Sequence, residues 1–275
     1  MADGLQLMRL AARNIATSKD GTLLVKQFEA EFRSLTQTQH ALTVNSGTAA
    51  LHSAYFAVGV RKNTEVIVPS YTWFATAAPV LQLGATPIFC DIDPDTLTIA
   101  PDRVEALITE RTRAICAVHV WGNPAAMERL AAIAQKYRIA LIEDASHAHG
   151  ATYQDRPVGS WGDIACFSLQ GSKAVSGGEL GIVVTNTAEL YDRMLLLGHY
   201  GRIPQDLQTH RWDLDALSLG FKYRPHLYGV ALALGSLRRL PELNRLRRRN
   251  YDLLSRELQG CEAIAPVTTY PDATR

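Results

Sequence analysis

Short apolar runs alternate with helix-like stretches along most of this chain of 275 residues. The apolar runs, rich in Val, Ile and Ala, lie at residues 66–69, 87–91, 114–119, 139–144, 164–168 and 181–185. Between them, the stretches 73–83, 102–109, 125–137 and 188–197 have the composition of helices. Strands that are apolar throughout, with helices between them, are typical of a parallel sheet covered on both faces. The pattern predicts an α/β fold with a mostly parallel central sheet sandwiched by helices.

The overall composition argues against several classes of function. Hydrophobic residues make up 47% of the chain and the formal net charge is +1, so the charge balance gives no reason to expect nucleic acid or an anionic membrane as a partner. The apolar runs are all shorter than the roughly 18 residues of a membrane-spanning helix. Residues 1–19 also lack the apolar core of a signal peptide. We therefore expect a cytoplasmic protein.

Neither the cysteines nor the arginine-rich stretch near the end indicates a further binding function. Cys90, Cys116 and Cys166 lie in apolar runs and Cys261 stands alone, a spacing that predicts free thiols and no metal site. Residues 240–259 are expected to form a helix, and its arginines at 245 and 247–249 lack the interleaved aromatics of nucleic-acid-binding segments. A solvated helix face or a subunit contact is the expected role.

Several of the apolar runs end in a polar residue, namely His119, Asp144 and Ser168. In a parallel sheet the carboxyl ends of the strands gather at one edge, where ligands bind. Lys173 follows shortly after Ser168, in a loop rich in Ser and Gly. An acid at a strand end and a lysine in such a loop suit pyridoxal phosphate (PLP), whose aldehyde forms a Schiff base with lysine and whose pyridine nitrogen pairs with a carboxylate. Lys173 and Asp144 are therefore the candidate catalytic residues.

Residues 44–51 form a turn of small residues that opens a helix. Gly47 lets the backbone approach an anion closely, and the first N–H groups of the helix point toward that anion. Ser46 and Thr48 can add hydroxyl donors. The same pattern is also that of an ordinary N-cap, so this segment by itself leaves both interpretations open.

Aromatic and histidine side chains near the strand ends leave similar choices. Trp73 could lie over a pyridine ring by offset stacking, or it could pack in the core. His119 and His149 are each either a packed histidine beside a strand end or a residue of the site. Of these, Trp73 is the candidate for stacking on a ring.

Five motifs in a fixed order resemble those of the DegT/StrS-type aminotransferases. They occupy residues 46–51, 69–73, 143–151, 167–173 and 177–179, within a resemblance that extends from about residue 25 to residue 254. This resemblance implies a fold type I transferase with PLP as cofactor, built as a homodimer with shared active sites. It also implies the reaction, in which an amino group moves from glutamate or glutamine to a keto-sugar or keto-cyclitol in natural-product or glycan biosynthesis.

The resemblance implies a role for each matching residue. Gly47, Thr48 and Ser168 would hold the cofactor phosphate, and Trp73 would stack on the ring. Asp144 would pair with the ring nitrogen, and His147 would lie near the phenolic oxygen. Lys173 would form the Schiff base and, once displaced by the substrate amine, move a proton between the substrate and the cofactor.

Two positions depart from the family pattern. Lys222 stands where many members have an Asn that reaches the phosphate of the neighbouring subunit, and a lysine can also bind a phosphate there. Leu180 stands where the family commonly has a glycine, so the turn must change if that glycine has a positive φ. Glu179, just before it, either helps to position the lysine loop or faces solvent.

The resemblance also suggests the domain limits. We expect an N-terminal arm at residues 1–24, a large PLP-binding domain at 25–240, and at 241–275 a connecting helix and the start of a small C-terminal domain that is truncated here. Two alternatives to transamination stay open. The same residues could support another PLP reaction, such as epimerisation, dehydration or condensation, or the truncated chain could be a non-catalytic PLP-binding homologue.

Overall fold

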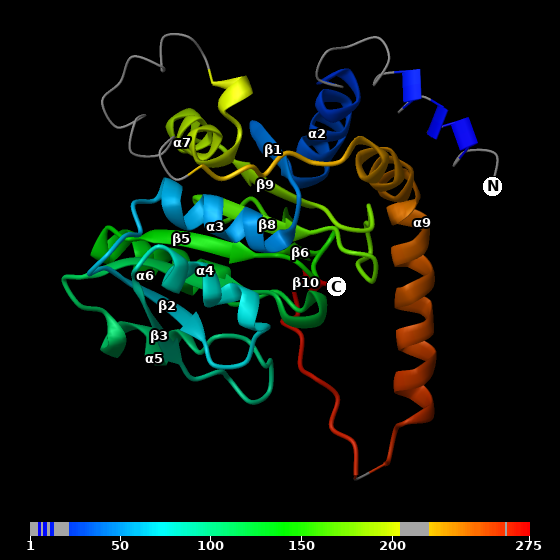
Figure 1. Cartoon of the computed structure of the whole chain (residues 1–275). Helices are drawn as coiled ribbons and strands as arrows, with labels where there is room; N and C mark the ends of the chain where they lie inside the picture. Colours follow the sequence, from blue (N-terminus) through cyan, green and yellow to red (C-terminus); the bar gives the residue numbers. More distant parts are fainter. Residues whose placement is uncertain (1–4, 7, 10–11, 14–21, 204–219, 262) are drawn as a thin grey trace.

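A seven-stranded sheet forms the centre of the protein (Figure 1). The computed structural model describes residues 5–6, 8–9, 12–13, 22–203, 220–261 and 263–275. The strands, in the order β1-β9-β8-β5-β4-β2-β3, are β1 (His40–Val44), β2 (Glu65–Pro69), β3 (Thr86–Cys90), β4 (Thr112–Val118), β5 (Ala140–Asp144), β8 (Ile164–Ser168) and β9 (Gly181–Thr185). Neighbours from β3 to β8 pair in parallel, whereas β9 runs antiparallel to both β8 and β1. The mostly parallel sheet expected from the sequence is confirmed.

Helices cover both faces of this sheet. One face packs against α3 (Gly47–Ala57), α4 (Ala78–Gln82) and α7 (Ala188–Gly198); the other packs against α2 (Thr22–Thr36), α5 (Pro101–Val104), α6 (Met127–Tyr137) and α9 (Leu227–Glu257). Side chains alternate along each strand, so Cys116 packs in the α3 layer while Ile115 and Ala117 pack in the α6 layer. Because both layers are apolar, these strands are apolar throughout.

Three helices differ from their expected ranges. The stretch 73–83 is divided into a 3-10 turn, η1 (Phe74–Thr76), and α4, which has a proline in its first turn. The stretch 102–109 is likewise divided into α5 and η2 (Glu105–Leu107). Helix α9 begins at Leu227 rather than near residue 240 and continues through Pro241. Its first half is buried against α2 and the sheet. This tertiary packing stabilises a helical segment that the local sequence does not predict.

The chain returns to the large domain after α9. Strand β10 (Ala273–Thr274) pairs with β6 (Thr152–Tyr153), which in turn pairs with β7 (Arg156–Pro157). Asn123 Nδ2 donates to the carbonyl oxygen of Thr268 at 2.9 Å, which further fixes this returning segment. The domain limits expected from the sequence stay a prediction.

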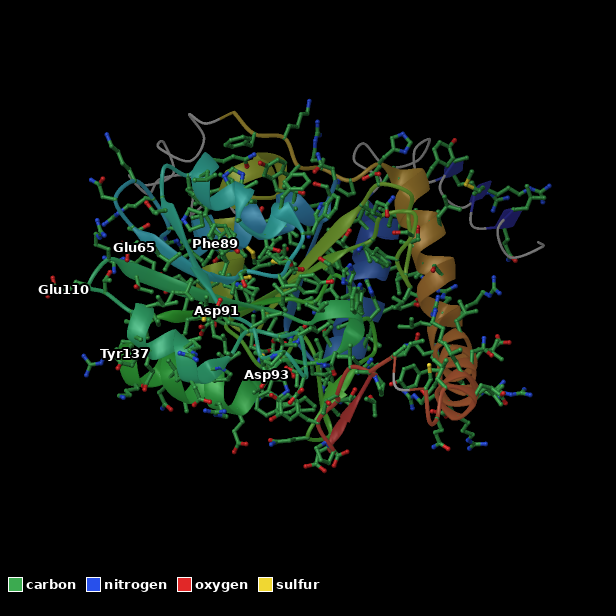
Figure 2. The ribbon with its side chains drawn as sticks, turned by 90° about the horizontal axis from the view of Figure 1, so that it is seen from below. Glu65, Phe89, Asp91, Asp93, Glu110 and Tyr137 are labelled. Carbon is green, nitrogen blue, oxygen red and sulfur yellow. The ribbon has the colours of Figure 1, made fainter. Side chains whose placement is uncertain are left out.

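The amino end of β2 is closed by structural contacts. Glu65 begins β2 and is buried, and its carboxylate pairs with Arg111 and accepts a hydrogen bond from Thr109 Oγ1 (Figure 2). Phe89 lies on β3, one of the two edge strands of this sheet, and is exposed. The opposite edge of the sheet, at the carboxyl ends of the parallel strands, is where side chains meet around a cavity.

Two further properties concern the thiols and the helices of the described residues. Three of the cysteines, Cys90, Cys116 and Cys166, are buried free thiols, and the free thiol of Cys261 is exposed. Across the described residues, no helix has both the length and the apolar character needed to cross a bilayer.

Candidate active site

A cavity of about 710 Å³ lies at the carboxyl ends of the parallel strands. It collects every residue expected to bind PLP except Lys222, that is, Gly47, Thr48, Trp73, Asp144, His147, Ser168 and Lys173. These residues come from the start of α3, the segment after β2, the end of β5 and its following loop, and the end of β8 with the loop beyond it. The sheet therefore brings together residues that are far apart in sequence, as its parallel topology predicts.

The start of α3 forms one wall of the cavity. Ser46 is its N-cap, since Ser46 Oγ accepts a hydrogen bond from Ala49 N at 3.0 Å. The N–H groups of Gly47 and Thr48 have no acceptor within the helix, because they belong to its first turn. A Cβ on residue 47 would lie 2.7 Å from Ser168 Cβ, so only glycine lets α3 approach β8 this closely. The N-cap interpretation is thus correct, and it leaves two N–H groups and the helix dipole available to an anion.

Asp144 supplies a buried negative charge at the end of β5. It is 6% exposed and lines the cavity. Its Oδ2 accepts a hydrogen bond from Thr76 Oγ1 at 2.8 Å, and its Oδ1 accepts one from Ser146 N at 3.2 Å. Among the described residues it forms no ion pair. A buried carboxylate without a cation is costly, so this cavity suits a cationic group.

Two threonines that the sequence analysis did not single out support Asp144. Thr76 donates its hydroxyl hydrogen to Asp144, so Thr72 Oγ1 must be the donor in the 2.7 Å contact between Thr72 and Thr76. Thr72 lies before η1, and Trp73 between the two threonines has an extended main chain (φ −71°, ψ 141°), so the contact arises from the bend of this segment and not from helical spacing. Local sequence therefore gave no signal for this pair.

Lys173 is half-buried in the loop after β8. Its main-chain N donates to the Gln170 carbonyl at 2.9 Å, and Ser236 of α9 contacts the loop through Ser176 N at 3.2 Å. Burial lowers the pKa of the Lys173 amine, and the negative charge of Asp144 opposes this shift. A lysine with a lowered pKa is more often neutral near pH 7, as a nucleophile or base must be.

Leu180 does not distort the turn after the lysine loop. The residue with positive φ there is Gly178, at +88°, while Leu180 is fully buried in the core. A Cβ on Gly181 would lie 2.2 Å from the carbonyl oxygen of Ser46, so glycine is required at 181 for close packing. The concern raised by the family pattern therefore does not apply at position 180.

His147 lines the cavity and contacts the segment after β4. Its Nδ1 accepts a hydrogen bond from the main-chain N–H of Trp121 at 3.2 Å. Burial and the positive charge of Lys173 lower the pKa of His147, and Asp144 opposes them. Trp121 has φ 51° and ψ 28°, a left-handed conformation that costs a bulky residue about 1–3 kcal/mol.

The other two histidines near the strand ends do not line the cavity. His119 is buried, with Nε2 3.1 Å from Glu143 Oε2 and Nδ1 accepting from Ala125 N, so its interpretation as a packed histidine is confirmed. His149 is also packed, 5.5 Å from the ring of Phe167, but neither ring nitrogen has a hydrogen-bond partner among the described residues. Burial and Lys173 lower the pKa of His149 to about 3.

Aromatic rings lie at the mouth of the cavity. Trp73 is 71% exposed, so its interpretation as a core residue is wrong. Tyr71 and Trp121, which the sequence analysis left out, contact each other edge to face with ring centroids 5.9 Å apart, and both line the cavity. Glu179 also lines it and is exposed.

Lys222 lies outside this cavity. Its side chain is exposed, and its main-chain carbonyl is 3.5 Å from Asn45 Nδ2, beside the start of α3. The role expected for Lys222 concerns a neighbouring subunit and stays a prediction.

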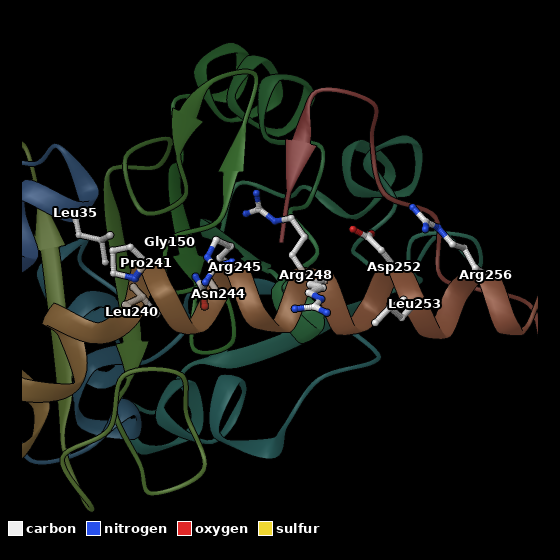
Figure 3. A pocket seen from close by; sticks show the side chains of 11 residues that line it. Leu35, Gly150, Leu240, Pro241, Asn244, Arg245, Arg248, Asp252, Leu253 and Arg256 are labelled. Carbon is white, nitrogen blue, oxygen red and sulfur yellow. The ribbon is translucent and has the colours of Figure 1, made fainter. Parts of the chain in front are cut away.

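A second cleft, of about 630 Å³, lies along the far half of α9 and shares no residue with the first (Figure 3). Arg245, Arg248, Arg249 and Arg256 line it together with Asp252. These arginines are exposed, as a solvated helix face requires. Within the described residues, no group of three or more His, Cys, Asp or Glu is placed to hold a metal ion here or elsewhere.

The first cavity has the features that PLP requires. Its helix N-terminus can bind a phosphate, its buried carboxylate can pair with a cationic ring nitrogen, and its lysine amine has a lowered pKa. Exposed aromatic rings flank the space between this helix N-terminus, the carboxylate and the lysine amine.

Comparison with known proteins agrees with this assignment. The chain matches the DegT/DnrJ/EryC1/StrS aminotransferase family over residues 7–275. DesV of S. venezuelae, solved in complex with a ketimine intermediate, is 32% identical with a TM-score of 0.87, over 98% of this chain and 71% of DesV. 3-Amino-5-hydroxybenzoic acid (AHBA) synthase is 33% identical with a TM-score of 0.88, over 97% and 70% of the two chains.

DesI, solved in the presence of its TDP-sugar product, is 34% identical with a TM-score of 0.85, and the match covers 95% of this chain and 64% of DesI. This chain thus corresponds to between 64% and 71% of the length of these three structures. Because the family match spans nearly the whole sequence and the cavity fits the cofactor, the chain belongs to the DegT/DnrJ/EryC1/StrS aminotransferase family and is a PLP-dependent aminotransferase.

Proposed function

We propose that this enzyme transfers an amino group from glutamate or glutamine to the keto group of a sugar or cyclitol, with Lys173 as the covalent attachment point of PLP. The observation that carries this proposal is that the half-buried Lys173 lines the same cavity as Asp144, which is buried and forms no ion pair among the described residues. When bound, PLP supplies an electron sink that stabilises the negative charge left at the substrate carbon.

The residues of the cavity would divide the remaining work. The N–H groups of Gly47 and Thr48, with the Ser168 hydroxyl, would bind the phosphate. Asp144 would hold a proton on the ring nitrogen by its negative charge, with Thr76 fixing the orientation of the carboxylate. The Lys173 amine, whose pKa is lowered by burial, would move a proton from the substrate carbon to the cofactor.

The acceptor side of the cavity favours a ring that carries hydroxyl groups. Tyr71 and Trp121 offer apolar faces on which a ring can pack, and Trp73 would stack on the cofactor ring. Gln170, Ser172 and Glu179 line the same cavity and can hydrogen-bond hydroxyl groups. DesI was solved with a TDP-sugar product, whereas AHBA synthase is named for an aromatic amino acid product, so the fold alone does not select a sugar.

Assembly and location belong to the same proposal. We expect a cytoplasmic homodimer in which Lys222 of each subunit reaches the phosphate of the other. Lys222 is exposed and lies outside the cavity of its own chain, which supports a role across an interface. Measurement of the mass in solution, and of PLP affinity in Lys222→Ala, would test this arrangement.

The first experiment is the visible absorption spectrum with PLP, before and after borohydride reduction, followed by peptide mapping. We expect reduction to fix the cofactor on the peptide that contains Lys173 and Lys173→Ala to remove the modification. Lys26→Ala, which changes an exposed lysine of α2, is the matched control. Modification of the Lys173→Ala variant to the same extent would overturn the assignment.

The reaction itself is tested with glutamate or glutamine and a panel of keto-sugars, keto-cyclitols and aromatic ketones. Incorporation of the donor nitrogen into a keto-sugar or keto-cyclitol supports the proposal. Amination confined to aromatic ketones, or conversion without nitrogen transfer, would exclude the proposed acceptor. A folded protein that binds PLP but converts no compound would favour the non-catalytic alternative.

A further inference from the structure

Trp121 holds an unusual main-chain conformation beside His147. Its φ of 51° and ψ of 28° lie in the left-handed region, and the next residue, Gly122, also has a positive φ of 84°. Trp121 is 58% exposed. Burial of the ring therefore does not explain why a bulky residue adopts this conformation.

The conformation has a clear consequence for the neighbouring histidine. It places the Trp121 N–H 3.2 Å from His147 Nδ1. On the other side, a Cβ on Gly122 would lie 3.2 Å from the His147 carbonyl oxygen, so this segment packs closely against the main chain of residue 147 as well. Residues 119–123 thus form a turn around His147, closed by hydrogen bonds from Gly122 N to the His119 carbonyl and from Asn123 N to the Val120 carbonyl.

A main-chain N–H can only donate, so the Nδ1 that faces it must be an unprotonated acceptor. The ring then carries its single proton on Nε2. An imidazolium, or the other neutral tautomer, would place two donors against each other. Burial and the positive charge of Lys173 favour the neutral ring, in agreement with the hydrogen bond.

We propose that Trp121 is a positioning residue, whose left-handed main chain holds His147 as the neutral Nε2–H tautomer, so that His147 presents a hydrogen-bond donor to the cofactor in the cavity. This inference rests on the proposed function for the identity of the group that receives the hydrogen bond. The state of the histidine itself can be measured without any reaction.

The direct test is ¹⁵N NMR of protein labelled in its histidine imidazoles, recorded before and after addition of PLP and without substrates. The His147 signals are assigned by their loss in His147→Gln. We expect an unprotonated Nδ1 and a protonated Nε2 in both samples. A protonated Nδ1, or rapid averaging between the two tautomers, would overturn the proposal.

Two substitutions at Trp121 separate the main chain from the ring. Trp121→Gly removes the ring but still permits the left-handed conformation, so the tautomer should persist. Trp121→Val removes the ring and disfavours that conformation, so the tautomers should average and PLP affinity should fall about tenfold. Arg138→Val, at another left-handed position with φ 54° at the end of α6, is the control for the general effect of such a change.

Retention of the tautomer and of PLP affinity in Trp121→Val would show that Trp121 has no positioning role.

At residue 147, Gln offers an acceptor and a donor as the proposed tautomer does, whereas Glu offers acceptors alone. His147→Gln should therefore bind PLP about tenfold better than His147→Glu, and equal affinities would contradict the proposal. If His147 keeps the Nε2–H tautomer but the enzyme does not transaminate, the proposed function alone is contradicted. If the enzyme transaminates but the His147 tautomers average, the positioning role of Trp121 alone is contradicted.

Discussion

Glu143 and Asp144 are neighbours on β5, but their carboxylates lie in opposite surroundings. The oxygens of Glu143 accept hydrogen bonds from the main-chain N–H groups of Gly159, Trp161 and Gly162 and from His119. Asp144 faces the cavity and, among the described residues, accepts hydrogen bonds from Thr76 and Ser146. Side chains alternate across a strand, so the two acids point to opposite faces of the sheet.

The difference shows how one strand can carry both a structural and a functional acid. The loop after β7 reaches Glu143 because two of its residues are glycines. A Cβ on Gly159 would lie 2.7 Å from Phe167 Cζ, and one on Gly162 would lie 2.5 Å from the Leu141 carbonyl oxygen. The negative charge of Glu143 is thus satisfied within the protein, whereas that of Asp144 remains available to a cation in the cavity.

The largest expected effect comes from Asp144→Asn. Loss of the charge that would hold a proton on the ring nitrogen should lower kcat/KM for transamination by about 10³-fold. The free energy of unfolding without PLP should not fall, because the substitution removes a buried charge that forms no ion pair among the described residues. Steady-state kinetics and urea unfolding measure the two quantities. A kcat/KM within about tenfold of the wild type would show that the charge of Asp144 is not needed for transamination.

Glu143→Gln should show the reverse pattern. An amide has one acceptor oxygen, so its nitrogen must face N–H donors, and the free energy of unfolding should fall by about 2 kcal/mol. The rate per folded molecule at saturating PLP should fall far less than in Asp144→Asn. Glu110→Gln, in an exposed loop, is the control for urea unfolding. Unchanged stability in Glu143→Gln would mean that the buried carboxylate is not required.

Buried histidines extend the comparison to pH. Burial lowers the pKa of His149 to about 3 and that of His52 to about 4, from an ordinary value of 6.5. Below pH 6.5 these histidines bind protons in the unfolded chain but stay neutral in the folded protein. The contribution of the two neutral histidines to stability is therefore present above pH 6.5, and it is lost as the pH falls toward their lowered pKa values. Each histidine should contribute a slope of about 1.4 kcal/mol per pH unit to the free energy of unfolding within that range.

Urea unfolding between pH 7 and pH 5 would measure this slope. His149→Gln should make it shallower by the contribution of one histidine, whereas His226→Gln, which changes an exposed residue, should leave it unchanged. An unchanged slope in His149→Gln would show that His149 does not remain neutral in the folded protein.

The smallest effect is expected at the hydroxyl that orients Asp144. Thr76→Val keeps the shape of the side chain and removes the hydrogen bond to Oδ2, so kcat/KM should fall about fivefold to tenfold. Thr43→Val is the control, because the buried Thr43 hydroxyl has no partner among the described residues. Equal kinetics in the two variants would show that Thr76 does not orient the carboxylate.

Much of the fold and of the site followed from local sequence. The apolar runs predicted six strands because a parallel sheet with two apolar faces leaves no alternation of polar residues. Since the carboxyl ends of parallel strands meet, the positions of His119, Asp144 and Ser168 at the ends of apolar runs predicted a shared site. The cavity contains Asp144 and Ser168 but not His119.

Tertiary structure decided the features that depend on contacts between distant segments. The start of α9 at Leu227 reflects burial against α2 and the sheet, and the exposure of Trp73 reflects its place at the mouth of the cavity. The left-handed turn at Trp121 and the hydrogen bond from Thr76 to Asp144 join segments that are remote in sequence. Residue type and spacing determined which groups could meet, but the conformations and partners of those groups arise from packing that no local pattern encodes.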